Sequence, residues 1–344
     1  MKLQTILCGM ALTATAAFAQ TAPNYTVRLN LTEDEDGLTA YITDFDSGEK
    51  VDSTVVADGV ALFNGTVEKP IFARLILDGN RAGMFILEPG EITVGGERRI
   101  GTGTATNEAF NTLLQNQNEL VQRFNKLTPA DSTEAKAIRD QYNALSTKAL
   151  AENAQNPLGY YLFVQEAYNW DLPEFNAKLQ EYPQFADSRR LQTLKQGLLN
   201  KEETSVGHKF KDFENTYDGK TQRLSDYVGR GRYTLVDFWA SWCGPCIRET
   251  KTIKELYSKY GPEGTNQLDV LGVAVWDEPE NTLRAIEQHQ LPWEQILNTQ
   301  NVATDIYGIP AIPCIILFGP DGTILSRDKQ DAELKADVAA ALGE

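Results

Sequence analysis

Two cysteines with two residues between them lie in the segment "WASWCGPC", at positions 239–246. Gly244 and Pro245 separate Cys243 from Cys246. Residues of this type at this spacing can form half of a metal site, a structural disulfide, or a dithiol that is reversibly oxidised. The function of the protein depends on which of the three is present.

A metal site is the weaker interpretation, because a structural zinc ion takes four ligands, usually two such pairs or one pair with histidines. The sequence has two histidines, His208 and His289, both far from the pair, and, once Cys8 is removed with the expected signal peptide, one further thiol, Cys314. A purely structural disulfide is also disfavoured, because bridging positions i and i+3 closes a very short loop and removes little entropy from the unfolded chain.

A redox-active dithiol fits the local pattern. The apolar run "TLVDFWA" is typical of a strand, and "CGPCIRETKTIKELY" predicts a helix that begins at the first cysteine. Unpaired N–H groups and the helix dipole stabilise an anion at such a position, so the thiolate of Cys243 is favoured. Pro245 falls in the first turn, where its missing N–H costs nothing. We therefore expect Cys243 to attack a substrate disulfide and Cys246, one turn further, to resolve the mixed disulfide.

Asp237 interrupts the apolar strand "LVDFW" just before the cysteines. An unpaired carboxylate in the interior is costly, and burial raises its pKa. A carboxylate with a raised pKa below the cysteines can accept the proton of Cys246. The alternative interpretation is an aspartate on an edge strand that faces water.

Strands and helices alternate after the polar stretch "NKEETSVG", which predicts a mixed sheet covered by helices. Residues 25–95 instead contain about six short strands with turns between them, among them a hairpin at Asp58-Gly59, which predicts a small antiparallel β domain. Residues 104–200 carry helical periodicity interrupted at X-Pro pairs. We expect four segments: 1–19, 20–100, 101–203 and 204–344.

The first nineteen residues have the pattern of a cleaved signal peptide: Lys2, an apolar run and the A-x-A site Ala17-Phe18-Ala19. Lipid attachment at Cys8 is disfavoured because Leu7, just before it, is not small. Export from a bacterial cytoplasm to the periplasm is therefore expected. The net charge of -16 argues against nucleic acid or an anionic membrane surface as the main partner.

The segment "LVDFWASWCGPC" resembles the active-site strand and turn of thioredoxins, and "YGIPAIPCIILFGPDG" resembles their cis-proline segment. Residues 206–344 resemble the TlpA/ResA-like thioredoxins of the bacterial envelope. The first 200 residues resemble the N-terminal domain of the DUF4369 type, with its helical segment, that precedes such thioredoxins in Bacteroidetes. The expected fold is an α/β thioredoxin fold preceded by a small antiparallel β domain and a helical segment.

The resemblance implies roles for further residues. The Ile312-Pro313 bond is expected to be cis, and the family pairs this loop with the backbone of its substrate while the proline blocks metal capture. Trp242 is expected to cover the disulfide and Trp239 to pack beneath it. Gly244 and Pro245 complete the expected substrate-binding set. Neither a metal nor another cofactor is implied.

This sequence departs from the family at three places. Lys251 stands where the family usually has a helix-kinking proline, five residues after the second cysteine. Cys314 follows the cis-proline position, where a threonine or another small residue is usual; it is expected to be a small buried residue, or else to tune or trap Cys243. The lysine that faces the buried aspartate in some thioredoxins has no counterpart in "LGVAVWDE".

The expected function is that of an exported thiol–disulfide oxidoreductase, with Gly-Pro between the cysteines resembling the reducing members. The resemblance implies protein disulfides as substrates, including those of apocytochrome c, and a membrane electron donor of the DsbD/CcdA kind. A disulfide oxidase or isomerase is the alternative with the same chemistry. A peroxidase, and a binding module that uses the fold as a platform for residues 25–200, are alternatives of other classes.

Overall fold

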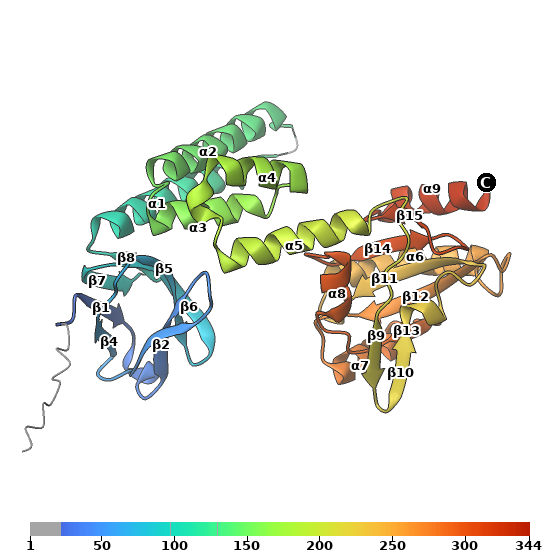
Figure 1. The fold of residues 1–344 in the computed structure, drawn as a ribbon, viewed down its shortest axis with the longest axis horizontal. Helices are drawn as coiled ribbons and strands as arrows, with labels where there is room; N and C mark the ends of the chain where they lie inside the picture. Colours follow the sequence, from blue (N-terminus) through green and yellow to red (C-terminus); the bar gives the residue numbers. More distant parts are fainter. Residues whose placement is uncertain (1–21, 97, 129) are drawn as a thin grey trace, which may run out of the picture. The chain divides into compact units, whose positions relative to one another are not determined.

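A computed structural model describes residues 22–96, 98–128 and 130–344 (Figure 1). The signal peptide expected at 1–19, with Cys8, lies outside these residues. The described chain forms two compact units, the first ending at Gln165 and the second beginning at Glu166. The boundary falls inside the segment 101–203, which the sequence suggests is one helical region. The domain limits expected from the sequence stay predictions.

The first unit contains a sheet of eight strands in the order β3-β2-β5-β6-β8-β7-β1-β4. Its strands are β1 (Tyr25–Asn30), β2 (Thr39–Asp44), β3 (Lys50–Val55), β4 (Val60–Gly65), β5 (Ile71–Leu77), β6 (Asn80–Leu87), β7 (Gly90–Gly95) and β8 (Ile100–Thr102). The predicted turn at Asp58-Gly59 joins β3 to β4, with both residues at positive φ. The sheet is mainly antiparallel, as expected, but β1 pairs with β7 and β6 with β8 in parallel.

Helices follow this sheet in the first unit. They are α1 (Ala105–Phe124), α2 (Ser132–Glu152) and α3 (Pro157–Ala167), the last of which crosses the boundary between the units. Asn107 of α1 is fully buried, and its side-chain amide exchanges hydrogen bonds with the backbone N–H and carbonyl of Ile86. The ring of Tyr161 stacks on Phe72 at 4.1 Å between centroids. Both contacts attach helices to the sheet.

The second unit is built on a five-stranded sheet in the order β13-β12-β11-β14-β15. Its strands are β11 (Tyr233–Trp239), β12 (Leu268–Ala274), β13 (Glu294–Ile296), β14 (Cys314–Phe318) and β15 (Ile324–Arg327), and a separate hairpin has β9 (Glu214–Tyr217) and β10 (Lys220–Arg223). The helices are α4 (Leu172–Glu181), α5 (Arg189–Glu203), α6 (Gly244–Tyr260), α7 (Pro279–Gln288), α8 (Val302–Tyr307) and α9 (Asp331–Leu342).

The two faces of this sheet carry separate apolar cores. Side chains of α6 and α9 pack on the face that includes Leu235 and Trp239. Side chains of α8 and of the segment before β11 pack on the face that includes Val236 and Phe238. Alternate residues of β11 therefore point to different cores, as the pleat of a strand requires.

Helix α5 is closely packed on α8, which precedes the cis-proline loop. Gly308, at φ 56°, ends α8, and a Cβ atom there would collide with the carbonyl oxygen of Gly197 in α5. The guanidinium of the buried Arg327 donates to the carbonyl oxygens of Thr204, at the end of α5, and Tyr307, at the end of α8. These contacts fix the start of the loop that carries Pro313.

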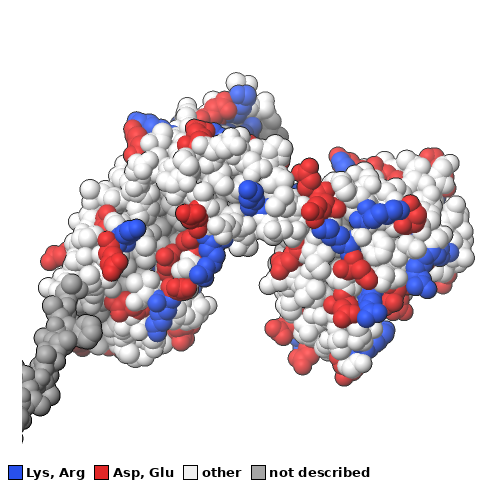
Figure 2. Space-filling model, viewed as in Figure 1, with Lys and Arg blue, Asp and Glu red and all other residues white. Residues whose placement is uncertain are grey.

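Charged side chains are mixed on the surface. On the face shown in Figure 2, Lys and Arg lie scattered among Asp and Glu and do not gather into one basic patch. The absence of nucleic acid among the partners stays a prediction. Within the part of the chain that the structure describes, no helix is long and apolar enough to cross a membrane.

Candidate active site

Cys243 and Cys246 form a disulfide at the N-terminus of α6. Cys243 is the N-cap residue of the helix, and Pro245 lies in the first turn. Both positions confirm the helix start that the sequence predicts. The backbone N–H of Cys246 donates a hydrogen bond to Cys243 Sγ over 3.2 Å. Once the disulfide is reduced, this N–H stabilises a thiolate on Cys243.

The two sulfurs differ in access. Cys243 is 3% exposed, and Cys246 is fully buried behind it. Gly244, the next residue of the turn, is exposed. Cys243 is therefore the more accessible of the two sulfurs. The division of roles expected from the sequence, with Cys243 attacking and Cys246 resolving, stays a prediction.

The turn before the cysteines is held by the loop after β12. The indole N–H of Trp242 donates to the carbonyl oxygen of Trp276 over 2.9 Å, while 60% of Trp242 stays exposed. The buried carboxylate of Asp277 accepts hydrogen bonds from the backbone N–H and the hydroxyl of Ser241, and from the hydroxyl of Thr282. Asp277 was not among the residues expected from the sequence.

Trp239 lies in the same apolar core as the two cysteines. It is 1% exposed, and its indole N–H donates to the side-chain oxygen Oε1 of Gln295 over 3.0 Å. The expected position of the ring beneath the disulfide stays a prediction.

The Ile312-Pro313 peptide bond is cis, as the resemblance implies. Cys243 Sγ lies 3.7 Å from the carbonyl oxygen of Ile312. The loop expected to bind substrate backbone is thus next to the sulfur expected to react, although 69 residues separate them in sequence.

Asp237 lies on β11, the central strand of the sheet, and is 2% exposed. The alternative of an edge-strand aspartate facing water is therefore wrong. Burial, followed by the nearby negative charge of Glu249, raises the pKa of Asp237 to about 8. One of its oxygens, Oδ1, has no hydrogen-bond partner among the described residues. A group with this pKa is suited to proton transfer near neutral pH.

Glu249 is a second buried carboxylate at the site, and sequence reasoning did not identify it. It lies on α6, is 4% exposed, and accepts a hydrogen bond from the backbone N–H of Asp331. Burial is the main cause that raises its pKa. Glu249 follows Cys246 by three residues, so both side chains lie on one face of the helix. This spacing is the sequence feature that could have indicated Glu249 as a site residue.

Cys314 lies on the opposite side of the sheet from the disulfide. Its side chain belongs to the core that contains Phe238, whereas Cys243 and Cys246 belong to the other core. The thiol donates to Asp328 Oδ1 over 3.1 Å, and burial is the first cause that raises its pKa. Cys314 is thus the small buried residue expected, and the sheet separates it from Cys243. Lys251, the other departure from the family, is exposed on α6.

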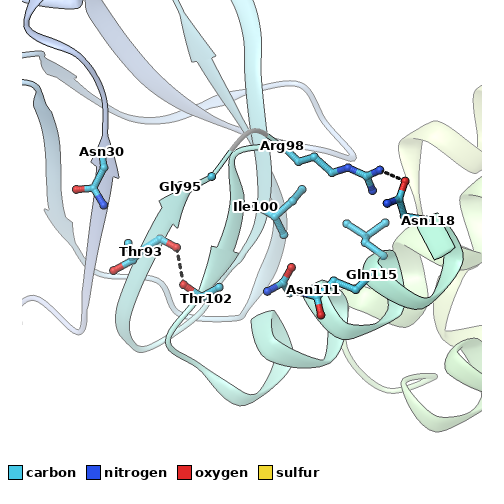
Figure 3. A pocket seen from close by; sticks show the side chains of 11 residues that line it. Asn30, Thr93, Gly95, Arg98, Ile100, Thr102, Asn111, Gln115 and Asn118 are labelled. Carbon is cyan, nitrogen blue, oxygen red and sulfur yellow. Dashed lines mark hydrogen bonds between the residues drawn. The ribbon is translucent and has the colours of Figure 1, made fainter. Parts of the chain in front are cut away.

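The first unit contains a separate pocket of about 610 Å³, bounded by β7, β8 and α1 (Figure 3). The guanidinium of Arg98 donates to Asn118 at one end of it, and Asn111 and Gln115 of α1 face it from the helix. Six of its eleven lining residues carry an amide or hydroxyl group, and Ile100 and Leu114 are apolar members. Among the described residues, no cluster of acidic, histidine or cysteine side chains could hold a metal ion.

Fold and site together define a class of protein. A central strand leads directly into a helix that begins with a C-x-x-C disulfide, and a cis-proline faces the first sulfur. This is the arrangement of a thiol–disulfide oxidoreductase with a thioredoxin fold.

Comparisons with known proteins agree with this class. Residues 206–327 match the AhpC/TSA family, and residues 25–110 match a domain of unknown function, DUF4369. The chain is 30% identical over 128 residues to the thiol-disulfide oxidoreductase ResA of Geobacillus thermodenitrificans, covering 37% of this chain and 71% of that protein. It is 35% identical over 105 residues to the thiol:disulfide interchange protein CycY of Rhizobium leguminosarum, covering 30% and 53%.

Similar solved structures include the thioredoxin domain of a thiol-disulfide oxidoreductase from Bacteroides vulgatus. That match has 26% identity and a TM-score of 0.36, and covers 40% of this chain and 96% of the other. A thiol:disulfide interchange protein from Bacteroides sp. has 27% identity and a TM-score of 0.35, with coverage of 40% and 90%. The chain belongs to the ResA family of thiol-disulfide oxidoreductases.

Proposed function

We propose that the protein is an exported reductase of protein disulfides that works through the Cys243/Cys246 dithiol. The observation that carries the proposal is the position of the pair: Cys243 caps α6 and receives the N–H of Cys246, while Cys246 is fully buried behind it. This arrangement supports a single attacking sulfur and a protected resolving sulfur.

In the reduced protein the Cys243 thiolate attacks one sulfur of a substrate disulfide. A mixed disulfide forms, and the other substrate sulfur leaves as a thiolate. Cys246 then gives its proton to the Asp237 carboxylate and attacks Cys243 Sγ, which releases the second substrate thiolate and restores the Cys243–Cys246 disulfide. Two electrons pass from the dithiol to the substrate. The raised pKa of Asp237 supports its role as the proton acceptor.

Substrate binding is assigned to the surface around Cys243. The cis-proline loop lies next to the reactive sulfur in space, through the carbonyl oxygen of Ile312. The sequence neighbours of Cys243 are the exposed Trp242 and the turn residues Gly244 and Pro245. Trp239 supports the disulfide from the core. An extended substrate segment can pair with the backbone beside Pro313, as the resemblance implies, and bring its disulfide to Cys243.

The proposed location is the periplasm, reached through a cleaved signal peptide at 1–19. A reductase in an oxidising compartment must be reduced again after each cycle. We assign that step to a membrane dithiol donor of the DsbD/CcdA kind. Disulfides of exported proteins, including apocytochrome c, are the proposed substrates. Both partner assignments rest on the family resemblance and on the exported location.

The test is reduction of insulin disulfides by the purified protein with dithiothreitol as electron source. We expect turnover that is lost in Cys243→Ser and kept in the matched control Cys314→Ser, because Cys314 lies in the other core. Equal activity of the wild type and Cys243→Ser would overturn the proposal. Consumption of peroxide without reduction of insulin would favour the peroxidase alternative instead.

A further inference from the structure

Two buried side-chain atoms on the face of the sheet that carries the disulfide make no hydrogen bond with the rest of the described chain: Asp237 Oδ1 and Gln295 Nε2. One is an acceptor when Asp237 is ionised, and the other is a donor. A buried polar group without a partner destabilises a fold by about 1–3 kcal/mol. The burial of an acceptor and a donor, both without a partner and on one face of the sheet, needs a physical explanation.

The strand register places these side chains in one row across the sheet. Asp237 of β11 is the partner of Gly272 in β12, and Gly272 is the partner of Gln295 in β13. Gly272 has no side chain, and a Cβ atom there would collide with the amide of Gln295. The Gln295 amide therefore lies directly over Gly272, in the space beside Asp237.

The orientation of the amide is fixed by Trp239, which lies two residues after Asp237 and on the same face of the sheet. The indole N–H of Trp239 donates to Gln295 Oε1 over 3.0 Å. Because the oxygen is engaged by Trp239, the NH₂ group is the end of the amide that remains without a partner.

We propose that Gln295 is a positioning residue whose Nε2–H donates a hydrogen bond to the Asp237 carboxylate when Asp237 is ionised. The inference rests on the proposed role of Asp237 as the proton acceptor for Cys246. The bond forms when the two side chains rotate toward each other across Gly272, which has no side chain between them. The donor is a neutral amide on β13, in a chain with no counterpart in "LGVAVWDE" of the lysine that faces this aspartate in some thioredoxins.

Burial and the charge of Glu249 disfavour the ionised form of Asp237. Glu249 on α6 is the one charged side chain that shifts the pKa of Asp237, and its charge raises it. Cys246 lies on the same helix and Cys314 on β14, and Asp331 contacts Glu249. A donor such as Gln295 Nε2 stabilises the ionised form of Asp237, which is the form that accepts the proton of Cys246.

The experiment is a pH titration of the Asp237 carboxyl carbon by ¹³C NMR, in the reduced full-length protein. Gln295→Met keeps the size of the side chain and removes the donor. We expect the Asp237 midpoint to rise by roughly one pH unit, because the ionised form loses a charge-assisted hydrogen bond. Gln222→Met is the matched control: Gln222 is also buried, but its amide donates to Tyr227 and to the backbone of Gln295.

A second measurement needs no variant. The Nε2 proton resonances of Gln295 in the wild-type protein are expected to shift with pH at the Asp237 midpoint. An Asp237 midpoint that is the same in wild type and Gln295→Met, or Gln295 resonances that do not follow Asp237, would overturn the inference. Neither result depends on reduction of insulin, so the proposed function and this inference fail separately.

Discussion

Cys243 Sγ lies 3.7 Å from the carbonyl oxygen of Ile312, the residue joined to Pro313 by a cis peptide bond. The sulfur and the carbonyl are 69 positions apart in the sequence, yet they lie next to each other in the fold. Cys243 is 3% exposed there, and we propose that a substrate approaches it along the Ile312-Pro313 backbone. The proposed attack of Cys243 on a substrate disulfide uses this proximity.

Replacement of the resolving cysteine is the first prediction. In Cys246→Ser, Cys243 still attacks a substrate disulfide, but the mixed disulfide cannot be resolved. We expect the variant to accumulate a covalent complex with a disulfide-containing protein, detected by mass spectrometry as an adduct that dithiothreitol removes. Cys243→Ser, the matched variant, is expected to give no adduct. An adduct of equal yield in both variants would show that Cys243 is not the attacking sulfur.

Asp237→Asn is expected to stabilise the oxidised protein in a pH-dependent way. Asp237 keeps its proton up to about pH 8 in the folded state, whereas an aspartate in the unfolded chain loses it near pH 4. The free energy of unfolding of the wild type therefore falls as pH rises between these two values, by up to about 1.4 kcal/mol per pH unit. Above the pKa of Asp237 in the folded protein, no further loss is expected.

Urea denaturation at several pH values measures this effect. The difference in free energy of unfolding, variant minus wild type, is expected to grow as pH rises through the window and to level off above about pH 8. A difference that is constant with pH would mean that the pKa of Asp237 is not raised in the folded protein.

Glu249→Gln is expected to lower the pKa of Asp237, because it removes the one charge that raises it. Glutamine retains an oxygen that can accept the Asp331 N–H, so the local fold is kept. Glu255→Gln on the same helix is the control, since Glu255 is exposed and pairs with Lys335. NMR titration of the Asp237 carboxyl is the measurement, and equal midpoints in the two variants would contradict the assignment of Glu249 to the site.

Cys314→Ala is expected to leave the redox chemistry unchanged and to cost about 1 kcal/mol of stability, through the lost hydrogen bond to Asp328. The sheet separates this thiol from the disulfide. Insulin reduction and the Cys243/Cys246 potential are the measurements. A changed potential in Cys314→Ala would mean that Cys314 communicates with the disulfide through β14.

The strand, the turn and the helix of the active site are predictable from sequence, because "TLVDFWASWCGPC" combines a buried apolar run with a helix start. The cis bond at Pro313 was reached through family resemblance alone, since X-Pro bonds are mostly trans. The burial of Asp237 followed from its apolar neighbours. These features depend on residues that are close in sequence.

Features set by strand register were not predictable in this way. Gln295 lies on a three-residue strand, and its position beside Asp237 depends on the pairing of β11, β12 and β13. The parallel pairs of the N-terminal sheet depend likewise on long-range order. Asp277 acts from a loop between β12 and α7, where no periodicity exists to indicate a role.

The most direct test of the central claim is the equilibrium reduction potential of the Cys243/Cys246 couple, titrated against glutathione or dithiothreitol. The account predicts a value near that of thioredoxin, about −270 mV, as a reductase fed by a membrane donor requires. A value near that of the oxidant DsbA, about −120 mV, would contradict it and mean that the protein donates disulfides to its substrates.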